Sequence, residues 1–314
     1  MIDMVSMKRT NLKEDSRIHS ISAVIPTYGR EQVLLETIHH LLNLHECPDE
    51  ILIIDQTADY VPAIREQLQA WHDAGAIRWL RLPVPSITHA MNVGLLEASG
   101  DVVLFLDDDI ITAPGLITAH RNAHVADESR IIAGQVLQPG EEPSSDDVFS
   151  FRSTRKQWVE ELMGGNFSVH RKTALRLGGF DENFVQVAYR FEAEFCDRAR
   201  LAGEKILFEP AASIRHLKAA SGGTRSFGHH LRTARPGHSV GAYYFLLRAR
   251  LVRNRWQQLF LRPFRAISTR HHLRRPWWIP VTLLAELTGM AWAVRLYHSG
   301  PRLLRPNMFQ DKLC

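Results

Sequence analysis

Residues 100–109, Gly-Asp-Val-Val-Leu-Phe-Leu-Asp-Asp-Asp, constrain the fold more than any other stretch of the sequence. The apolar run 102–106 is typical of a strand buried on both faces of a parallel sheet. It ends in Asp107, Asp108 and Asp109, and open α/β sheets bind ligands at the carboxyl ends of their strands. Three adjacent carboxylates repel one another unless a cation offsets their charge, and Mg²⁺ or Mn²⁺ prefers oxygen ligands. The pattern predicts an Asp-x-Asp metal site, Asp107 and Asp109, that holds a diphosphate; the alternative is a polar strand end that caps a helix.

Apolar strands alternate with helices of 3.6-residue periodicity through the first part of the chain. Such alternation with short turns predicts a doubly wound, mainly parallel sheet flanked by helices. The expected strands cover 21–26, 51–54, 77–82, 102–106, 131–137 and 206–208, and the expected helices cover 31–44, 61–72, 87–98, 114–124, 171–177 and 188–202.

Charge is distributed very unevenly along the 314 residues. Segment 215–314 has 18 Lys and Arg and only two acids, whereas 1–214 has 20 basic and 32 acidic residues. This split predicts two functional regions, of which the basic one faces phosphate, nucleic acid or anionic lipid. We therefore divide the chain into a polar, disordered lead-in (1–18), an α/β domain (19–225) and a basic, aromatic-rich helical extension (226–314).

The N-terminal segment and the cysteines indicate a cytoplasmic protein. Residues 1–20 contain no apolar run of the kind found in a cleaved secretion signal. The three cysteines have neither metal-binding spacing nor an even count, which favours a reducing compartment.

One further strand end and one helix start carry candidate site residues. Asp55 ends the strand 51–54, so it shares a sheet edge with Asp107 and could accept a hydrogen bond from a ribose or a base; a turn-forming aspartate is the alternative.

Glu192 and Glu194 lie on different faces of the helix 188–202. Glu194 precedes Arg198 by four residues, as in a helical salt bridge. Glu192 is then the candidate general base, or else a first-turn acid that complements the helix dipole.

His216 follows an apolar segment and could complete a metal site of two aspartates and one imidazole, or be an ordinary surface histidine. Gly164, Gly165 and Asn166 could bring backbone amides close to a sugar or phosphate, or simply form a turn.

Seven motifs follow one another between about Ile21 and about Arg225: Ala-Val-Ile-Pro-Thr-Tyr-Gly-Arg (23–30), Ile-Leu-Ile-Ile-Asp-Gln (51–56), Ala-Met-Asn-Val-Gly (90–94), Phe-Leu-Asp-Asp-Asp (105–109), Gly-Gly-Asn-Phe-Ser-Val-His-Arg (164–171), Gly-Gly-Phe-Asp-Glu (178–182) and Arg-Phe-Glu-Ala-Glu-Phe-Cys-Asp-Arg (190–198). In this order, they resemble inverting family 2 glycosyltransferases of the Rossmann-like GT-A fold, which implies a mixed, mainly parallel sheet flanked by helices. Three positions depart from the family's usual residues: Gly29 replaces Asn, Met91 replaces Arg, and Phe191 replaces an acid before Glu192. Gly-Gly-Thr-Arg (222–225) recurs in one bacterial clade.

The resemblance implies a metal-dependent transferase that moves a sugar from a nucleotide-sugar donor to a hydroxyl of a glycan or lipid-linked acceptor in bacterial cell-surface polysaccharide synthesis. It implies Mn²⁺ or Mg²⁺ as the cofactor and a single displacement that inverts the anomeric centre. The resemblance also implies a role for individual residues. Donor binding is implied for Pro26, Thr27, Tyr28, Asp55, Asn92, Asp107 and Asp108, and metal binding for Asp107, Asp109 and His216. Acceptor contacts are implied for Gly165, Asn166 and Glu194, and proton abstraction for Glu192.

The stretch 277–297 is the most apolar part of the extension and is about long enough to span a bilayer. Pro280, Glu286 and Arg295 argue against spanning, because a charge at mid-depth is costly. Its tryptophan pair and flanking arginines favour peripheral contact with an anionic membrane, at the inner face of the cell membrane. A spanning helix, or a helical lid or oligomer contact, are the alternatives. The arginines of 243–260 fall on two opposite sides of a helical wheel, which does not predict an amphipathic helix.

Other functions fit the sequence less well. A catalytically degenerate GT-A protein that tethers a biosynthetic complex at the membrane is the main alternative. A nucleotidyltransferase would have a glycine-rich, basic loop after the first strand, and residues 26–30 form no such loop. A P-loop ATPase is excluded because the chain has no G-x-x-x-x-G-K-[ST] motif. Nucleic acid is disfavoured as a partner, since the basic tail contains no recognised module.

Overall fold

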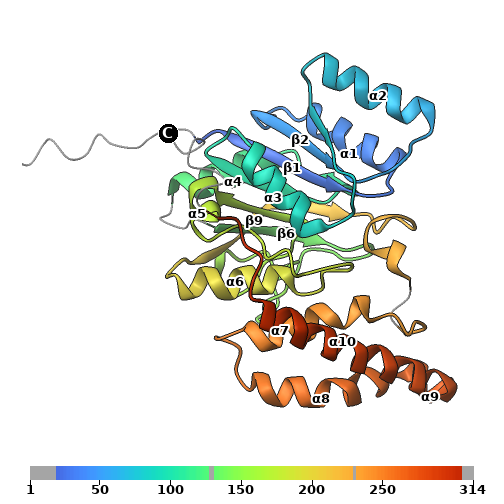
Figure 1. Cartoon of the computed structure of the whole chain (residues 1–314). Helices are drawn as coiled ribbons and strands as arrows, with labels where there is room; N and C mark the ends of the chain where they lie inside the picture. Colours follow the sequence, from blue (N-terminus) through green and yellow to red (C-terminus); the bar gives the residue numbers. More distant parts are fainter. Residues whose placement is uncertain (1–18, 127–130, 229–230, 306–314) are drawn as a thin grey trace, which may run out of the picture.

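A computed structural model describes residues 19–126, 131–228 and 231–305, so the predicted lead-in 1–18 lies outside the described residues. One mixed sheet runs through the centre, with the strand order β3-β2-β1-β4-β8-β6-β9-β5, and β7 pairs with β9. Helices cover both faces of the sheet, and a group of C-terminal helices lies to one side (Figure 1). The predicted mixed α/β architecture with helical C-terminal elements is confirmed.

The strands and helices that precede the three aspartates follow the predicted alternation of strand and helix. Their bounds are β1 (Ile21–Thr27), α1 (Gln32–Leu42), β2 (Glu50–Asp55), α2 (Pro62–Asp73), β3 (Arg78–Arg81), α3 (Ile87–Glu97) and β4 (Val102–Leu106). The four strands pair in parallel, as the βαβ repeats require.

Beyond β4 the sheet is partly antiparallel, which the apolar pattern did not predict. The bounds are β5 (Ile110–Thr112), α4 (Leu116–Ala126), β6 (Ile131–Leu137), β7 (Gln157–Val159), β8 (Asn166–His170), α5 (Arg171–Arg176), α6 (Phe191–Leu201) and β9 (Ile206–His216). Strand β8 runs antiparallel to both β4 and β6. The predicted strand 206–208 is the start of β9, which continues to His216 through a bulge in its pairing with β6.

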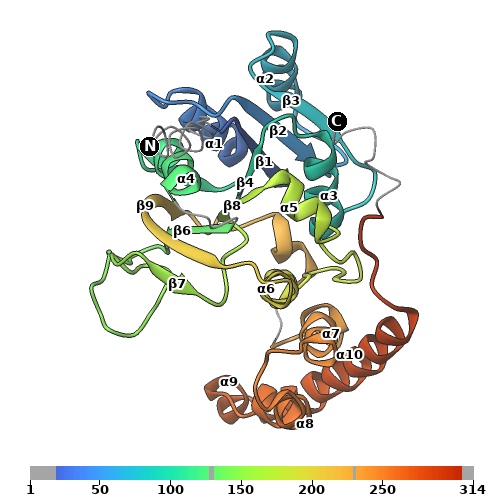
Figure 2. The same cartoon turned by 90° about the vertical axis from the view of Figure 1, so that its left-hand side faces the viewer.

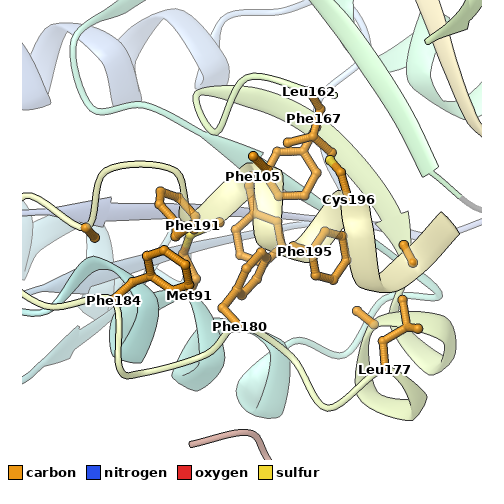
Figure 3. Packing of buried hydrophobic residues seen from close by; sticks show 14 of the residues in the cluster. Met91, Phe105, Leu162, Phe167, Leu177, Phe180, Phe184, Phe191, Phe195 and Cys196 are labelled. Carbon is orange, nitrogen blue, oxygen red and sulfur yellow. The ribbon is translucent and has the colours of Figure 1, made fainter. Parts of the chain in front are cut away.

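Side chains alternate between two cores along each central strand, as expected for a sheet covered on both faces. Val24 joins the cluster beneath α3 and α6, whereas Ala23 and Ile25 join the one beneath α1 and α2. Figure 3 shows the aromatic centre of the first cluster. There, Phe105 stacks on Phe167 with ring centroids 5.0 Å apart.

The C-terminal helices are α7 (Val240–Arg248), α8 (Arg255–Ile267), α9 (Arg270–Arg274) and α10 (Ile279–Ser299), with short 3₁₀ turns η1 (Gly223–Phe227), η2 (Pro236–His238) and η3 (Pro276–Trp278). Helix α7 lies between α6 and the outer helices (Figure 2). Its Val240, Tyr243 and Tyr244 are fully buried in the same cluster as Phe105. The core therefore continues across the predicted boundary at 225/226.

Buried aspartates of the first region also bind the second. Asp181 accepts hydrogen bonds from Tyr244 Oη at 2.7 Å and from the Arg302 amide at 2.9 Å. Asp197 accepts the amides of Arg250 and Leu251, each at 2.9 Å. Arg248 also lies 3.6 Å from Asp181, and Arg302 lies 3.6 Å from Glu182, so part of the opposite charge of the two regions is paired internally.

Candidate active site

Strand pairing brings the acidic cluster and His216 together. The parallel register of β1 and β4 places Thr27 beside the residues that follow Leu106. The antiparallel pairing of β5 with β9 sets Ile110 opposite His216. Because Ile110 directly follows Asp109, the imidazole reaches the aspartates from a strand more than a hundred residues later in the chain.

Asp107, Asp109 and His216 form a cluster whose ligand atoms all lie within 4.8 Å of one another. His216 Nε2 is 3.0 Å from Asp109 Oδ1 and 3.8 Å from Asp107 Oδ2. Its other ring nitrogen, Nδ1, lies 3.1 Å from Gln138 Oε1, an acceptor. With the proton on Nδ1, the lone pair of Nε2 points toward the two carboxylates, which is the arrangement a metal ligand needs.

Asp108 points away from this cluster into a buried network. It accepts a hydrogen bond from Thr27 Oγ1 at 2.7 Å and one from Arg30 Nε at 3.1 Å. Arg30 also lies 3.3 Å from Asp109 and donates to the carbonyl of Ser221, so it joins β1, the acidic turn and the segment after β9. Arg30 was not among the predicted site residues, although its place directly after Tyr28-Gly29 was a usable signal.

The environment moves the carboxyl pKa values in opposite directions. Burial raises the pKa of Asp107, and it raises the pKa of Asp108 to about 7 despite the nearby Arg30. Burial alone would also raise the pKa of Asp109. When His216 carries a second proton, on Nε2, its hydrogen bond to Asp109 and its charge outweigh burial and lower the pKa of Asp109. A charge-rich site of this kind is typical of a functional centre.

A cavity of about 540 Å³ opens over the cluster. Pro26, Thr27 and Tyr28 line it together with all three aspartates, His216, Gly165 and Glu192. The two glycines of the 164–165 turn permit the close approach. A Cβ at Gly165 would overlap the Asp107 carboxylate, and one at Gly164 would come within 2.9 Å of Glu192 Oε1.

Glu192 lies in the first turn of α6 and faces this cavity. The preceding Arg190 has a left-handed backbone (φ 74°), which turns the chain into the helix. Burial raises the pKa of Glu192 to about 7, and the nearby charge of Asp107 contributes in the same direction. A carboxyl group with such a pKa can exchange protons near neutral pH.

Asp55 lies outside the cavity wall, contrary to its predicted place in the donor site. It is fully buried and accepts hydrogen bonds from the Thr57 amide at 2.8 Å, Tyr60 Oη at 3.1 Å and Trp79 Nε1 at 2.9 Å. Its neighbour Gln56 lines the cavity at this strand end instead. Asp55 thus organises the end of β2, and the alternative of a turn-forming aspartate describes it better.

Asn92, a predicted donor residue, is also withdrawn from the cavity. It is 1% exposed, and its amide donates to the Phe180 carbonyl at 2.8 Å while its oxygen accepts the Phe180 amide at 2.8 Å. The side chain therefore fastens α3 to the turn before α6. Met91, its neighbour, lines the cavity.

Two predicted acceptor-side residues are likewise buried in other contacts. Asn166 donates to the carbonyls of Gln135 at 3.0 Å and Ala212 at 2.8 Å, which leaves only Gly165 of this pair at the cavity. Glu194 is bound by Arg198 through two hydrogen bonds of 3.1 and 2.8 Å. The predicted salt bridge is confirmed, and it turns Glu194 away from the cavity wall.

The model of the glycosyl transferase family 2 matches residues 22–183, just over half of the chain. The chain belongs to this family. It is 25% identical over 224 residues to the probable glycosyltransferase YdaM of Bacillus subtilis (strain 168), covering 65% of this chain and 51% of YdaM. It is also 25% identical over 114 residues to the uncharacterized glycosyltransferase YfnE of the same organism, covering 36% of this chain and 29% of YfnE. The chain thus spans about half or less of the length of these relatives.

Solved structures share the fold at low identity. GalNAc-T7, described with UDP, GalNAc and Mn²⁺, superposes with a TM-score of 0.59 at 15% identity, over 91% of this chain and 57% of that one. The mannosyltransferase PcManGT of Pyrobaculum calidifontis, described with GDP-Man and Mn²⁺, gives a TM-score of 0.55 at 18% identity, over 91% and 80%. Both likenesses extend beyond the segment matched by the family model.

Proposed function

We propose that this family 2 protein is a metal-dependent, inverting glycosyltransferase. It transfers a sugar from a nucleotide-sugar donor to a hydroxyl of a glycan or lipid-linked acceptor in cell-surface polysaccharide synthesis. The observation that carries the proposal is one cavity that contains the Asp107–Asp109–His216 cluster and also Glu192. The cluster suits the departing nucleoside diphosphate, and the glutamate suits the attacking hydroxyl.

The cluster fits a divalent cation by its donor set. Two carboxylates and one imidazole suit Mn²⁺, and carboxylates alone would also accept Mg²⁺. The lone pair of His216 Nε2 and the Asp109 carboxylate, 3.0 Å apart, repel each other unless a proton or a cation lies between them. A cation bound there would offset the charge of the leaving diphosphate. GalNAc-T7 and PcManGT are described with Mn²⁺, which supports this assignment.

Donor binding falls to the residues that line the cavity at the ends of β1, β2 and β4. Tyr28 and Gln56 offer an aromatic ring and an amide to the nucleoside. Arg30 holds Asp108 and Asp109 in place, so that Asp109 keeps its oxygen toward His216. UDP and GDP-Man in the two structural neighbours support a nucleotide-sugar as the donor class.

Glu192 is the proposed general base. Its carboxylate would accept the proton of the acceptor hydroxyl as that oxygen attacks the anomeric carbon. Attack from the glutamate side, opposite the diphosphate held by the aspartates, inverts that carbon. The acceptor would enter the cavity beside Glu192, whose carboxyl group lies against the 164–165 turn.

Calorimetry with UDP, GDP, dTDP and CDP, with and without Mn²⁺, tests the donor site. We expect one nucleotide to bind only with the metal, and we expect the Asp107→Ala plus Asp109→Ala variant to lose this binding. Asp146→Ala plus Asp147→Ala removes the same charge from an exposed loop and should bind as the parent does. A folded parent that binds none of the four nucleotides would contradict the proposal and favour a catalytically degenerate, tethering role.

A further inference from the structure

Helix α8 (Arg255–Ile267) is amphipathic, but its apolar face points away from the protein. Trp256, Phe260 and Phe264 are spaced four residues apart, so they lie along one side of the helix. Their exposed fractions are 52%, 69% and 64%. Leu259 is the one buried residue of this helix. An amphipathic helix of a soluble domain normally buries its apolar face, so this orientation needs a cause.

The polar side of α8 is held inward by a buried carboxylate. Arg262 Nε lies 3.1 Å from Glu286 Oε2 of α10, and Tyr243 of α7 donates to the same oxygen at 2.7 Å. Gln258 and Arg265 face the same cavity of about 500 Å³ as Glu286. Pairing Glu286 fixes the rotation of α8, because a buried charge without a partner is strongly destabilising. The aromatic residues are outside as a consequence of specific contacts.

Helices α8 and α9 lie at the outer edge of the molecule, farthest from the sheet (Figures 1 and 2). The exposed apolar side chains continue along the chain, with Leu273 at 83% and Trp277 at 66% exposure. Exposed arginines alternate with them, at Arg270, Arg274 and Arg275.

Charge indicates which partner fits this surface. Glu286 is the one acidic residue in segment 226–305, and it is buried, so this segment presents arginines but no exposed carboxylate. Two copies brought face to face here would oppose arginine with arginine. An anionic bilayer can bind both the arginines and the exposed aromatic side chains. Tryptophan and arginine suit the level of the lipid headgroups, and phenylalanine suits the boundary with the acyl chains.

We propose that the surface made by Trp256, Phe260, Phe264, Leu273 and Trp277, which we call the α8 surface, docks onto an anionic lipid bilayer. Docking is interfacial, with the helix lying in the plane of the membrane. The α8 surface keeps Trp277 of the predicted contact 277–297 and adds the exposed apolar side chains of α8 and α9. Docking does not depend on the proposed transfer reaction, although it would bring the cavity to a lipid-linked acceptor.

Helix α10 is the other membrane candidate. Among the described residues, Pro276–Ser299 is the one helix long and apolar enough to cross a bilayer. Yet α10 packs on α7, with Ala285, Glu286 and Gly289 buried, and a Cβ at Gly289 would overlap Ser239 Oγ. Spanning would separate Glu286 from Tyr243 and Arg262. The packing therefore favours surface docking through α8.

Vesicle flotation of the full chain, without any nucleotide, tests the α8 surface. The probes are vesicles of phosphatidylcholine alone and vesicles that also contain phosphatidylglycerol. We expect binding to the anionic vesicles that weakens with salt, and a loss of about tenfold or more in Phe260→Ser plus Phe264→Ser. Val84→Ser plus Val148→Ser is the matched control, because both valines are exposed on the sheet region, and it should bind as the parent does.

Other outcomes would overturn the proposal. Equal binding by the parent and the phenylalanine variant would exclude the α8 surface as the contact. Equal binding to neutral and anionic vesicles would remove the role of charge. A parent that self-associates in size-exclusion chromatography and ignores vesicles, while the variant stays monomeric, would assign the surface to a second copy. None of these results would alter nucleotide binding, so a failure here is distinguishable from a failure of the proposed transferase.

Discussion

Helix α1 in the sheet region and helix α8 in the C-terminal helices have the same kind of sequence, with apolar residues on one side and polar residues on the other. Helix α1 buries Leu34, Ile38 and Leu41 against the sheet. Helix α8 turns Arg262 inward and its aromatic residues outward. Periodicity defines the two faces of a helix, but the partners that its polar side chains find decide which face is buried.

The two regions also use charge differently. In the sheet region, the carboxylates lie close together at one edge of the sheet, around His216 and Arg30, so charge is concentrated within one cavity. In the C-terminal helices, the arginines are distributed over the surface, apart from those that meet Glu286, Asp181 or Glu194. The first arrangement suits the proposed transfer chemistry and the second suits the proposed membrane docking, and four experiments test this difference.

The largest expected effect is on turnover in Glu192→Gln. Removing a general base lowers kcat by about 10²- to 10⁴-fold. Because the pKa of Glu192 is raised to about 7, the base form accumulates as the pH rises through that value, so parent activity should increase across it. In the variant, kcat/KM should no longer increase as the pH rises through about 7, and a pH profile of kcat/KM measures this difference.

The same variant has a stability signature. A carboxyl group whose folded-state pKa lies above its unfolded value destabilises the fold as the pH rises through that window. Glu192→Gln should therefore melt no lower than the parent at about pH 8, in contrast to a variant that has lost its fold. Wild-type turnover by a folded Glu192→Gln protein would rule out the assigned base.

A smaller effect is expected from Gly165→Ala, a substitution that changes none of the proposed metal-ligand residues. The new Cβ overlaps the Asp107 carboxylate and must displace it. We expect Mn²⁺-dependent nucleotide affinity to fall by about tenfold, since a shift of this size in a ligand spoils coordination geometry. Gly115→Ala is the control because a Cβ there meets nothing within 4 Å. Unchanged affinity in Gly165→Ala would contradict the assignment of Asp107 to the metal.

Glu194→Gln should affect stability and leave chemistry intact. Glu194 is 4% exposed and bound twice by Arg198, with Arg248 of α7 at 3.6 Å. Replacing one partner of a buried ion pair costs about 2 to 4 kcal/mol, measured by urea denaturation. Turnover of the folded variant should match that of the parent. A large loss of kcat without a loss of stability would restore Glu194 to the reacting groups.

The smallest effects compare neighbouring residues of α8. Leu259→Ala should cost about 2 kcal/mol because Leu259 packs inward, whereas Phe260→Ala should change the unfolding free energy by less than about 0.5 kcal/mol. Chemical denaturation of both variants without lipid measures the difference. A large cost for Phe260→Ala would mean that the aromatic side of α8 packs within the protein, and it would remove the basis of the proposed docking.

Much of the sheet and its acidic edge could be predicted from the amino-acid sequence. Strand β4 was predicted over Val102–Leu106, the bounds it has in the structure, because an apolar run bounded by glycine and aspartate is specified by neighbouring residues. The grouping of Asp107, Asp109 and His216 also followed from the order of motifs. Strands β5 and β7 were missed because they have only three residues each and pair with a strand far away in the chain. Strand β8 was missed because the polar residues Asn166 and Ser168 interrupt its apolar pattern.

Which polar residues face the cavity depends on long-range packing and could not be predicted from the sequence. Asp55, Asn92 and Asn166 occupy motif positions, yet their hydrogen bonds are used by Trp79, Phe180 and Ala212. The sequence shows which side chains can donate or accept hydrogen bonds, but the partners of these side chains lie on other helices, strands or turns. The inward rotation of α8 has the same cause, since Arg262 and Glu286 are separated by more than twenty residues and meet only when α8 packs on α10. Local spacing fixes secondary structure, and long-range pairing of buried polar groups fixes orientation.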